Sequence, residues 1–89
     1  MDILWDEAKR KKLKSDRGID FEDVAQVILE KKYLAILENP RRPEQRLFVI
    51  SYKGYTHVVP FVLDDNDNII LKTVFPSRKL HKLYGEKKP

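Results

Sequence analysis

Two histidines and one tyrosine are the side chains of this sequence best suited to proton transfer. His57 lies within an apolar run, and His81 lies near the C-terminus with Tyr84 just after it. An imidazole changes its protonation state near neutral pH, so either histidine can act as a general acid or base. Their separation in the sequence excludes a local metal-binding motif. Each histidine can equally have a structural role, His57 on one face of a strand and His81 on the surface of a helix.

Cationic side chains could supply the second requirement of phosphate chemistry. Arg46 follows Arg41 and Arg42 after a proline-containing loop, while Arg78 and Lys79 come directly before His81. Guanidinium and ammonium groups beside a scissile phosphate stabilise the charge that develops on its oxygens. We expect Arg46, Arg78 and Lys79 to converge on one spot that binds a phosphodiester.

Two further basic stretches are less specific. Five basic residues occur between Lys9 and Lys14, but on a helix they point in several directions, so we expect them to be solvent-exposed surface. Lys87 and Lys88 belong to a C-terminal end that we expect to be frayed.

Several classes of site are excluded by the composition. The chain has no cysteine and only three glycines, which rules out thiolate metal sites, disulfides and a glycine-rich phosphate loop. The acidic segment Asp64–Asn68 has Ile69 and Phe75 where a calcium-binding EF-hand loop needs glycine and glutamate. It therefore predicts a turn. We expect no metal and no cofactor.

The length and charge fit one small folded domain spanning residues 1–89. The chain has a hydrophobic fraction of 42%, a charged fraction of 36% and a net charge of +4. A positive balance suits a polyanionic partner such as nucleic acid, although many soluble domains have a similar charge. We find no signal peptide and no apolar run of the roughly 20 residues that cross a membrane, so we expect a cytoplasmic protein.

Local patterns predict two helices at the N-terminus. One begins at Asp6 and ends at Gly18, which can adopt the left-handed conformation that closes a helix. The next begins after Asp20, and its apolar residues recur at helical spacing up to Ile28. Ile3–Trp5 is either a short strand or an anchor before the first helix.

The remainder predicts a meander of antiparallel strands and a short helix. The expected strands are 33–37, 47–52, 55–63 and 69–75, and the expected helix is 78–84 with Ser77 as its cap. Pro60 implies that its strand is bulged or lies at a sheet edge, because proline has no N–H to donate. The fold class is α+β, with both N-terminal helices packed on the sheet. Two of the strands are apolar on both faces, more than one helical layer can cover.

Three motifs of the sequence are distinctive: Leu4-Trp5-Asp6-Glu7-Ala8-Lys9, the segment from Arg17-Gly18-Ile19 to Asp23-Val24, and Pro76-Ser77-Arg78-Lys79 after the last strand. With these motifs the sequence resembles the BrnT-like toxin family of type II toxin–antitoxin systems over nearly its whole length, and the N-terminal block is the specific part. Relatives often have histidine before the glycine, Ser-Ala before the Arg-Lys pair, and a polar end to the third strand. Here these positions hold Arg17, Pro76-Ser77 and the mainly apolar 61–64.

This resemblance implies a RelE/ParE-like architecture and a metal-independent endoribonuclease held inactive by a small DNA-binding antitoxin, of the ribbon–helix–helix type. It implies that Arg78 and Lys79 stabilise the phosphate, which leaves Arg46 as a further ligand and His57, His81 or Tyr84 as proton carriers. An uncovered apolar sheet face would be the docking surface of the antitoxin, and both a homodimer and a toxin–antitoxin heterotetramer are open. The alternative function is a catalytically inactive module of the same fold that binds nucleic acid or protein.

Overall fold

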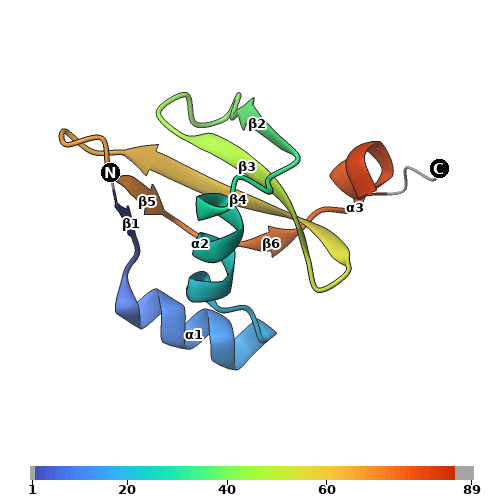
Figure 1. Cartoon of the computed structure of the whole chain (residues 1–89), viewed down its shortest axis with the longest axis horizontal. Helices are drawn as coiled ribbons and strands as arrows, with labels where there is room; N and C mark the ends of the chain where they lie inside the picture. The colour runs from blue at the N-terminus through green and yellow to red at the C-terminus, as the bar shows by residue number, and fades with distance from the viewer. Residues whose placement is uncertain (1, 86–89) are drawn as a thin grey trace.

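The structure confirms an α+β fold in which helices and strands are segregated along the chain (Figure 1). The computed structural model describes residues 2–85. In chain order the elements are β1 (Ile3–Leu4), α1 (Glu7–Arg17), α2 (Phe21–Leu29), β2 (Ala35–Glu38), β3 (Arg46–Tyr52), β4 (Tyr55–Leu63), β5 (Ile69–Leu71), β6 (Phe75–Pro76), α3 (Arg78–Leu80) and a π-helical turn, η1 (His81–Gly85). Within residues 2–85, no helix is long and apolar enough to cross a membrane.

Gly18 and Asp20 cap the N-terminal helices as predicted, and Asp6, where the first helix was expected to begin, is the N-cap of α1. The Asp6 carboxylate accepts a hydrogen bond of 2.8 Å from the backbone N–H of Ala8, which satisfies a donor at the start of α1. Gly18 ends this helix with φ of 67°, a conformation that costs glycine little. The Asp20 carboxylate accepts from the N–H of Glu22 in the same way at the start of α2.

The sheet is mixed rather than purely antiparallel. Its strand order is β1-β5-β4-β3-β2, and β6 also pairs with β4. Strand β1 runs parallel to β5, with Ile3 opposite Ile69, so the N-terminal segment that the sequence left open is a strand. The single strand expected over 69–75 is wrong: β5 and β6 both pair with β4, but residues 72–74 separate them.

Pro60 explains where this interruption occurs. Strand β4 lies in the middle of the sheet, so the prediction of an edge position for Pro60 is wrong. The Pro60 carbonyl accepts a hydrogen bond of 2.9 Å from the Lys72 N–H, which places the donor-less Pro60 nitrogen on the same side of the strand. Pro60 has no N–H that needs an acceptor. The pairing of β5 with β4 can therefore end at this point without leaving a buried N–H group without a hydrogen bond.

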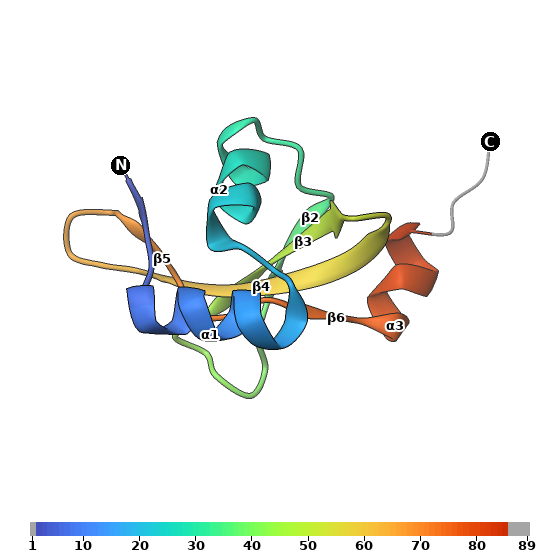
Figure 2. The ribbon, with the colours of Figure 1, turned by 90° about the horizontal axis from the view of Figure 1, so that it is seen from below.

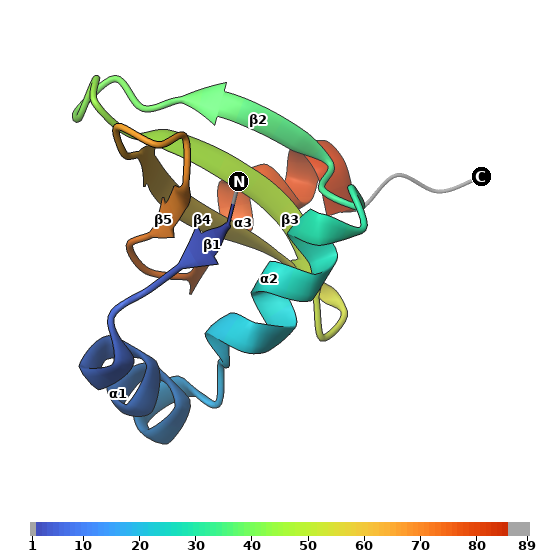
Figure 3. The ribbon, with the colours of Figure 1, turned by 60° about the vertical axis from the view of Figure 1, so that its left-hand side comes forward.

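One face of the sheet packs against α2 and forms the core (Figures 2 and 3). Alternate residues of β3 and β4 point to this face, among them Ile50, Val59 and Phe61, and they meet the buried side chains Phe21 and Val24 of α2. Helix α1 contributes less, since none of its residues is fully buried, although Leu13 packs against this core.

The opposite face, which we call the far face, is partly covered by the C-terminal segment. Here Thr56 and Val58 of β4 are buried, and α3 with the following turn contacts this strand. Ser77 caps α3 as predicted, with its Oγ accepting from the N–H of Leu80 at 3.2 Å. The helix predicted over 78–84 is in fact one short helical turn followed by η1.

An ion-pair network joins α1 to the start of α2. The Arg10 guanidinium donates to both oxygens of Asp20, at 3.0 Å and 3.4 Å, and also pairs with Glu22. The Asp20 side chain is only 14% exposed, and Lys14 adds a further contact at 3.4 Å. The hydrogen bond from Arg10 lowers the pKa of Asp20 to about 2, and the same bond raises the pKa of Arg10.

The acidic segment between β4 and β5 is a turn, as predicted. The Asp64 carboxylate accepts hydrogen bonds from the N–H groups of Asn66 and Asn68, at 2.8 Å and 2.9 Å, and the bond from Asn68 lowers the pKa of Asp64. Asn68 also accepts from the N–H of Asp2, so four aspartates, Asp2, Asp64, Asp65 and Asp67, are held at one end of the sheet.

Candidate nucleic-acid interface

His81 is fixed against the far face of the sheet at the start of β4, next to the tight turn that joins β3 to β4. We call this the hairpin end of β4. Its Nδ1 atom accepts a hydrogen bond from the backbone N–H of Thr56 at 3.3 Å and lies 3.0 Å from the Thr56 hydroxyl. In the neutral ring the hydrogen is therefore on Nε2. The imidazole stacks on the ring of Tyr55 with centroids 4.0 Å apart. Gly85 packs so closely on His81 that a Cβ at this position would overlap the imidazole.

His57 lies on the other face of the same strand. It is 8% exposed, and its Nδ1 donates to the carbonyl of Tyr55 at 3.0 Å. Its ring meets those of Tyr52 and Tyr55 edge-on. The sheet therefore separates the two histidines, and the Tyr55 ring contacts both of them.

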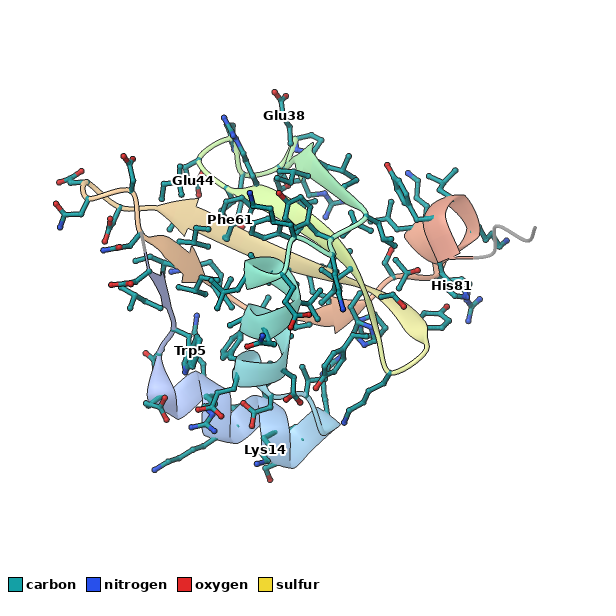
Figure 4. The ribbon with its side chains drawn as sticks, in the orientation of Figure 1. Trp5, Lys14, Glu38, Glu44, Phe61 and His81 are labelled. Atoms are coloured by element: carbon teal, nitrogen blue, oxygen red, sulfur yellow. The ribbon has the colours of Figure 1, made fainter. Side chains whose placement is uncertain are left out.

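The predicted convergence of Arg46 with Arg78 and Lys79 does not occur. Arg46 begins β3 opposite Phe61 and Glu38, whereas the segment before α3 pairs with His57 and Val58. Figure 4 shows Glu38 and Phe61 far from His81, which follows α3. At about 3.3 Å per residue, the stretch of β4 from Phe61 to Thr56 spans roughly 17 Å. The strand register is the physical reason for this separation. It places Arg46 at one end of β4 and the segment that leads to Arg78 and Lys79 at the other end.

The remaining predicted site residues lie at the end of the sheet where α3 packs. Arg78 and Lys79 are exposed, and Tyr84 is half-buried in η1. Lys87 and Lys88 lie outside the described residues. The structure thus gathers His57, His81, Tyr84, Arg78 and Lys79 around the hairpin end of β4 and leaves Arg46 at the other end.

A cavity lined by basic residues lies on the far face of the sheet. We call this cavity of about 570 Å³ the basic groove; its lining is Lys9, Asn39, Arg41, Arg42, Gln45, Leu47, Pro60, Lys72, Thr73 and Phe75. Four of these side chains are cationic and none is a carboxylate. Leu47 and Pro60 are register partners on adjacent strands, and together with Phe75 they form an apolar floor. In Figure 2 the loop between β2 and β3 lies on the side of the sheet opposite α2.

The loop between β2 and β3 holds two of these cations in a fixed arrangement. It consists of two successive turns, closed by hydrogen bonds from Arg42 N–H to the Asn39 carbonyl and from Gln45 N–H to the Arg42 carbonyl. Pro40 and Pro43 occupy the second position of each turn, where their restricted φ favours the turn conformation. The Asn39 side chain accepts from the Arg41 N–H at 3.1 Å. The prolines that exclude regular structure here therefore position Arg41 and Arg42.

Lys72 and Lys9 form the other wall. Lys72 lies in the interruption between β5 and β6, and Lys9 comes from α1. Both also line a neighbouring cavity of about 330 Å³ beside α1, which includes Lys12 and Arg17 together with Asp16, the ion-pair partner of Lys12. The concave basic surface therefore continues from the β2–β3 loop to α1.

Sequence reasoning named Arg41 and Arg42 only as neighbours of Arg46, the predicted phosphate ligand, and it missed the lysines of this groove. Lys72 stands alone in the apolar run Ile69–Phe75, and a single lysine in such a run was the available signal. Lys9 was assigned to exposed surface, because no local pattern shows that α1 and the β2–β3 loop line the same cavity. Among residues 2–85, no group of three or more His, Asp or Glu side chains lies close enough together to hold a metal ion.

Comparisons with known proteins agree with this architecture. Residues 5–82 match the family model described as the ribonuclease toxin, BrnT, of type II toxin–antitoxin systems. The fold is similar to the crystal structure of the Brucella abortus ribonuclease toxin BrnT, with a TM-score of 0.66 and 20% sequence identity over 86% of this chain and 96% of that chain. A comparison with curated proteins found no match. Because the family model covers most of its length, from the Trp5 block to the turn after α3, this chain belongs to the BrnT ribonuclease toxin family of type II toxin–antitoxin systems.

Proposed function

We propose that this protein is an endoribonuclease toxin that binds RNA in the basic groove and is neutralised by a cognate antitoxin. The observation that carries the proposal is the groove itself, in which four cations from three separate parts of the chain surround one concavity without any carboxylate. A phosphodiester backbone is the ligand that such a charge distribution favours.

The chemistry needs no bound metal when the RNA supplies its own nucleophile. The ribose 2′-hydroxyl attacks the adjacent phosphorus, a base removes the hydroxyl proton, and an acid protonates the departing 5′-oxygen. The products are a 2′,3′-cyclic phosphate and a 5′-hydroxyl. Lys72, Arg41 and Arg42 would stabilise the negative charge that develops on the phosphate oxygens.

The proton carriers and additional phosphate ligands are proposed at the α3 end of the groove. Its lining contains no imidazole, phenol or carboxylate, so His81 and Tyr84, beside the far face, stay the candidate acid and base. His57 is 8% exposed on the other face of the sheet and is not a candidate for this groove. Helix α3 begins soon after Phe75, a floor residue, and Arg78 and Lys79 are its first two residues. An RNA strand that leaves the groove along β6 would meet them.

The direct test is cleavage of an end-labelled RNA oligonucleotide by the purified protein in the presence of EDTA. We expect cleavage, with a 2′,3′-cyclic phosphate on the upstream product, and growth arrest when the chain is expressed alone. Salt-sensitive RNA binding without cleavage, together with harmless expression, would instead support the inactive binding module. The absence of an imidazole, phenol or carboxylate from the groove lining is the observation that favours this alternative.

We propose that the antitoxin docks on the helix-covered side of the sheet. A third cavity, of about 350 Å³, lies there between α2 and β2, with Leu29 and Ile36 in its lining at 63% and 45% exposure. Lys31 and Arg46 are its only charged residues. An antitoxin segment with apolar side chains and flanking carboxylates complements this surface.

Introducing a carboxylate into this cavity should disrupt the toxin–antitoxin complex. We expect Ile36→Asp to reduce co-purification with the co-expressed cognate antitoxin at least tenfold, because a charge would be buried against apolar groups. Cleavage of RNA by the isolated variant should be unchanged. Leu83→Asp is the matched control, since Leu83 is also exposed but lies on η1. Equal loss of the complex in both variants would contradict this docking surface.

A further inference from the structure

We infer that Phe75 is a base-stacking platform that makes the basic groove select single-stranded RNA. The inference rests on the proposed function of the groove and assigns a specificity-determining residue to it. Phe75 lies on β6 and faces the far side of the sheet, opposite Val58 of β4.

The exposure of this ring is unusual within the molecule. Phe75 is 39% exposed, and among the large apolar side chains exposed in residues 2–85 it alone is aromatic. The others are aliphatic, such as Leu34 and Leu63. Its neighbour Val74 is 1% exposed and packs in the core, so the backbone of this segment turns Val74 inward and Phe75 outward. Neither α2 nor the core covers the Phe75 side chain.

The surroundings of the ring match the two parts of a single-stranded nucleotide. Phe75 lies on the apolar floor with Leu47 and Pro60, while Arg41 and Lys72 line the same concavity. Proteins bind single strands by combining cations that follow the phosphates with aromatic rings on which bases stack. A nucleotide in this groove would have its phosphate among the cations and its base on the ring.

A duplex cannot use this arrangement. In paired RNA the base faces are stacked on one another, and only the edges reach the grooves. The phosphates of a duplex can still contact Arg41 and Lys72, but no base face can reach Phe75. The groove should therefore bind duplex RNA through charge alone and single strands through charge and stacking.

Three other aromatic rings of the sheet region are already engaged. Tyr55 stacks on His81 with ring centroids 4.0 Å apart, and Tyr52 meets His57 edge-on with ring centroids 5.4 Å apart. Tyr33 packs on Phe48 with a centroid distance of 5.1 Å, on the side of the sheet that carries α2. Phe75 is thus the ring that the basic groove offers to a ligand.

The test compares the affinity of Phe75→Ala and the wild type for a 2′-O-methylated RNA 12-mer, which resists 2′-hydroxyl attack, and for its duplex. We expect Phe75→Ala to bind the single strand about 5- to 100-fold more weakly. Duplex affinity and the slope of log affinity against log salt concentration should not change, because the phosphate contacts remain. Phe75→Tyr should restore single-strand binding, and Leu34→Ala, which removes an equally exposed apolar side chain elsewhere, should have no effect.

Each outcome separates this inference from the proposed nuclease activity. Unchanged single-strand affinity in Phe75→Ala, or equal losses for single strand and duplex, would overturn the stacking role even if the wild type cleaves RNA. A wild type that prefers single strands through Phe75 but does not cleave them would leave the stacking role intact and overturn the nuclease. Urea unfolding curves of Phe75→Ala and Phe75→Tyr show whether the folded state is retained.

Discussion

Removing Arg41, Arg42 and Lys72 together should abolish growth arrest and weaken RNA binding about 100-fold. The three cations line the basic groove from two walls, the β2–β3 loop and the interruption after β5. A charge-assisted contact to phosphate contributes about 1 kcal/mol or more, so three lost contacts correspond to roughly two decades in affinity. The salt slope for single-stranded RNA should also fall by about 2, which filter binding at several salt concentrations measures.

The matched control removes the same charge elsewhere. Lys11, Lys32 and Lys82 are exposed and line none of the cavities described above, so their triple alanine variant should retain toxicity and most of the affinity. Equal losses in the two triple variants would show that only net charge matters, which contradicts a specific groove. Arg78→Ala with Lys79→Ala tests the proposed α3 end: loss of cleavage with retained RNA binding is the expected result.

Replacing Asp20 with asparagine should destabilise the protein by about 2 kcal/mol at neutral pH. Asparagine can still cap α2, but it lacks the charge that pairs with Arg10 and Lys14. The pKa of Asp20 is lowered to about 2 from an ordinary value of 3.8. Its stabilising contribution is therefore present above about pH 4 and is lost as the pH falls towards 2.

Urea unfolding of wild type and Asp20→Asn at pH 7, 4, 3 and 2 measures this dependence. The difference in free energy of unfolding should be constant down to about pH 4 and should shrink towards zero near pH 2. Asp16→Asn, which removes an exposed partner of Lys12, should change stability by less than about 0.5 kcal/mol. A difference between wild type and Asp20→Asn that persists at pH 2 would show that the Arg10 pair is not its source. Because Arg10 adjoins Lys9, weakening the pair should also loosen one wall of the groove.

The helices could be predicted from the sequence because their ends depend on local chemistry. Asp6, Gly18 and Asp20 act on backbone groups within a few residues; Gly18 and Asp20 cap helices as expected, and Asp6 marks the expected start of α1. The division of the last predicted strand depends instead on Pro60 in the strand beside it. No pattern within 69–75 could reveal that interruption, since the cause lies in another part of the chain.

The candidate site was predictable only in its chemistry. The sequence indicated a phosphate site built from cations, and it singled out Arg46, Arg78 and Lys79, with Arg41 and Arg42 only as neighbours of Arg46. The basic groove, however, combines α1, the β2–β3 loop and the segment after β5, which only the strand order brings together. The separation of Arg46 from Arg78 likewise follows from register, which a single sequence does not state.

The acidic turn at the end of the β4–β5 hairpin also affects how the molecule meets a polyanion. Asp64, Asp65 and Asp67, with Asp2 beside them, concentrate negative charge at one end of a chain whose net charge is +4. In Figure 1 this turn and α3 are at opposite ends of the sheet. The strand register places Arg46, and with it the preceding loop that carries Arg41 and Arg42, at the same end of β4 as this turn. We therefore expect the aspartates to repel the phosphates of a strand bound in the groove, so that the strand extends from the loop towards α3 and not past the turn.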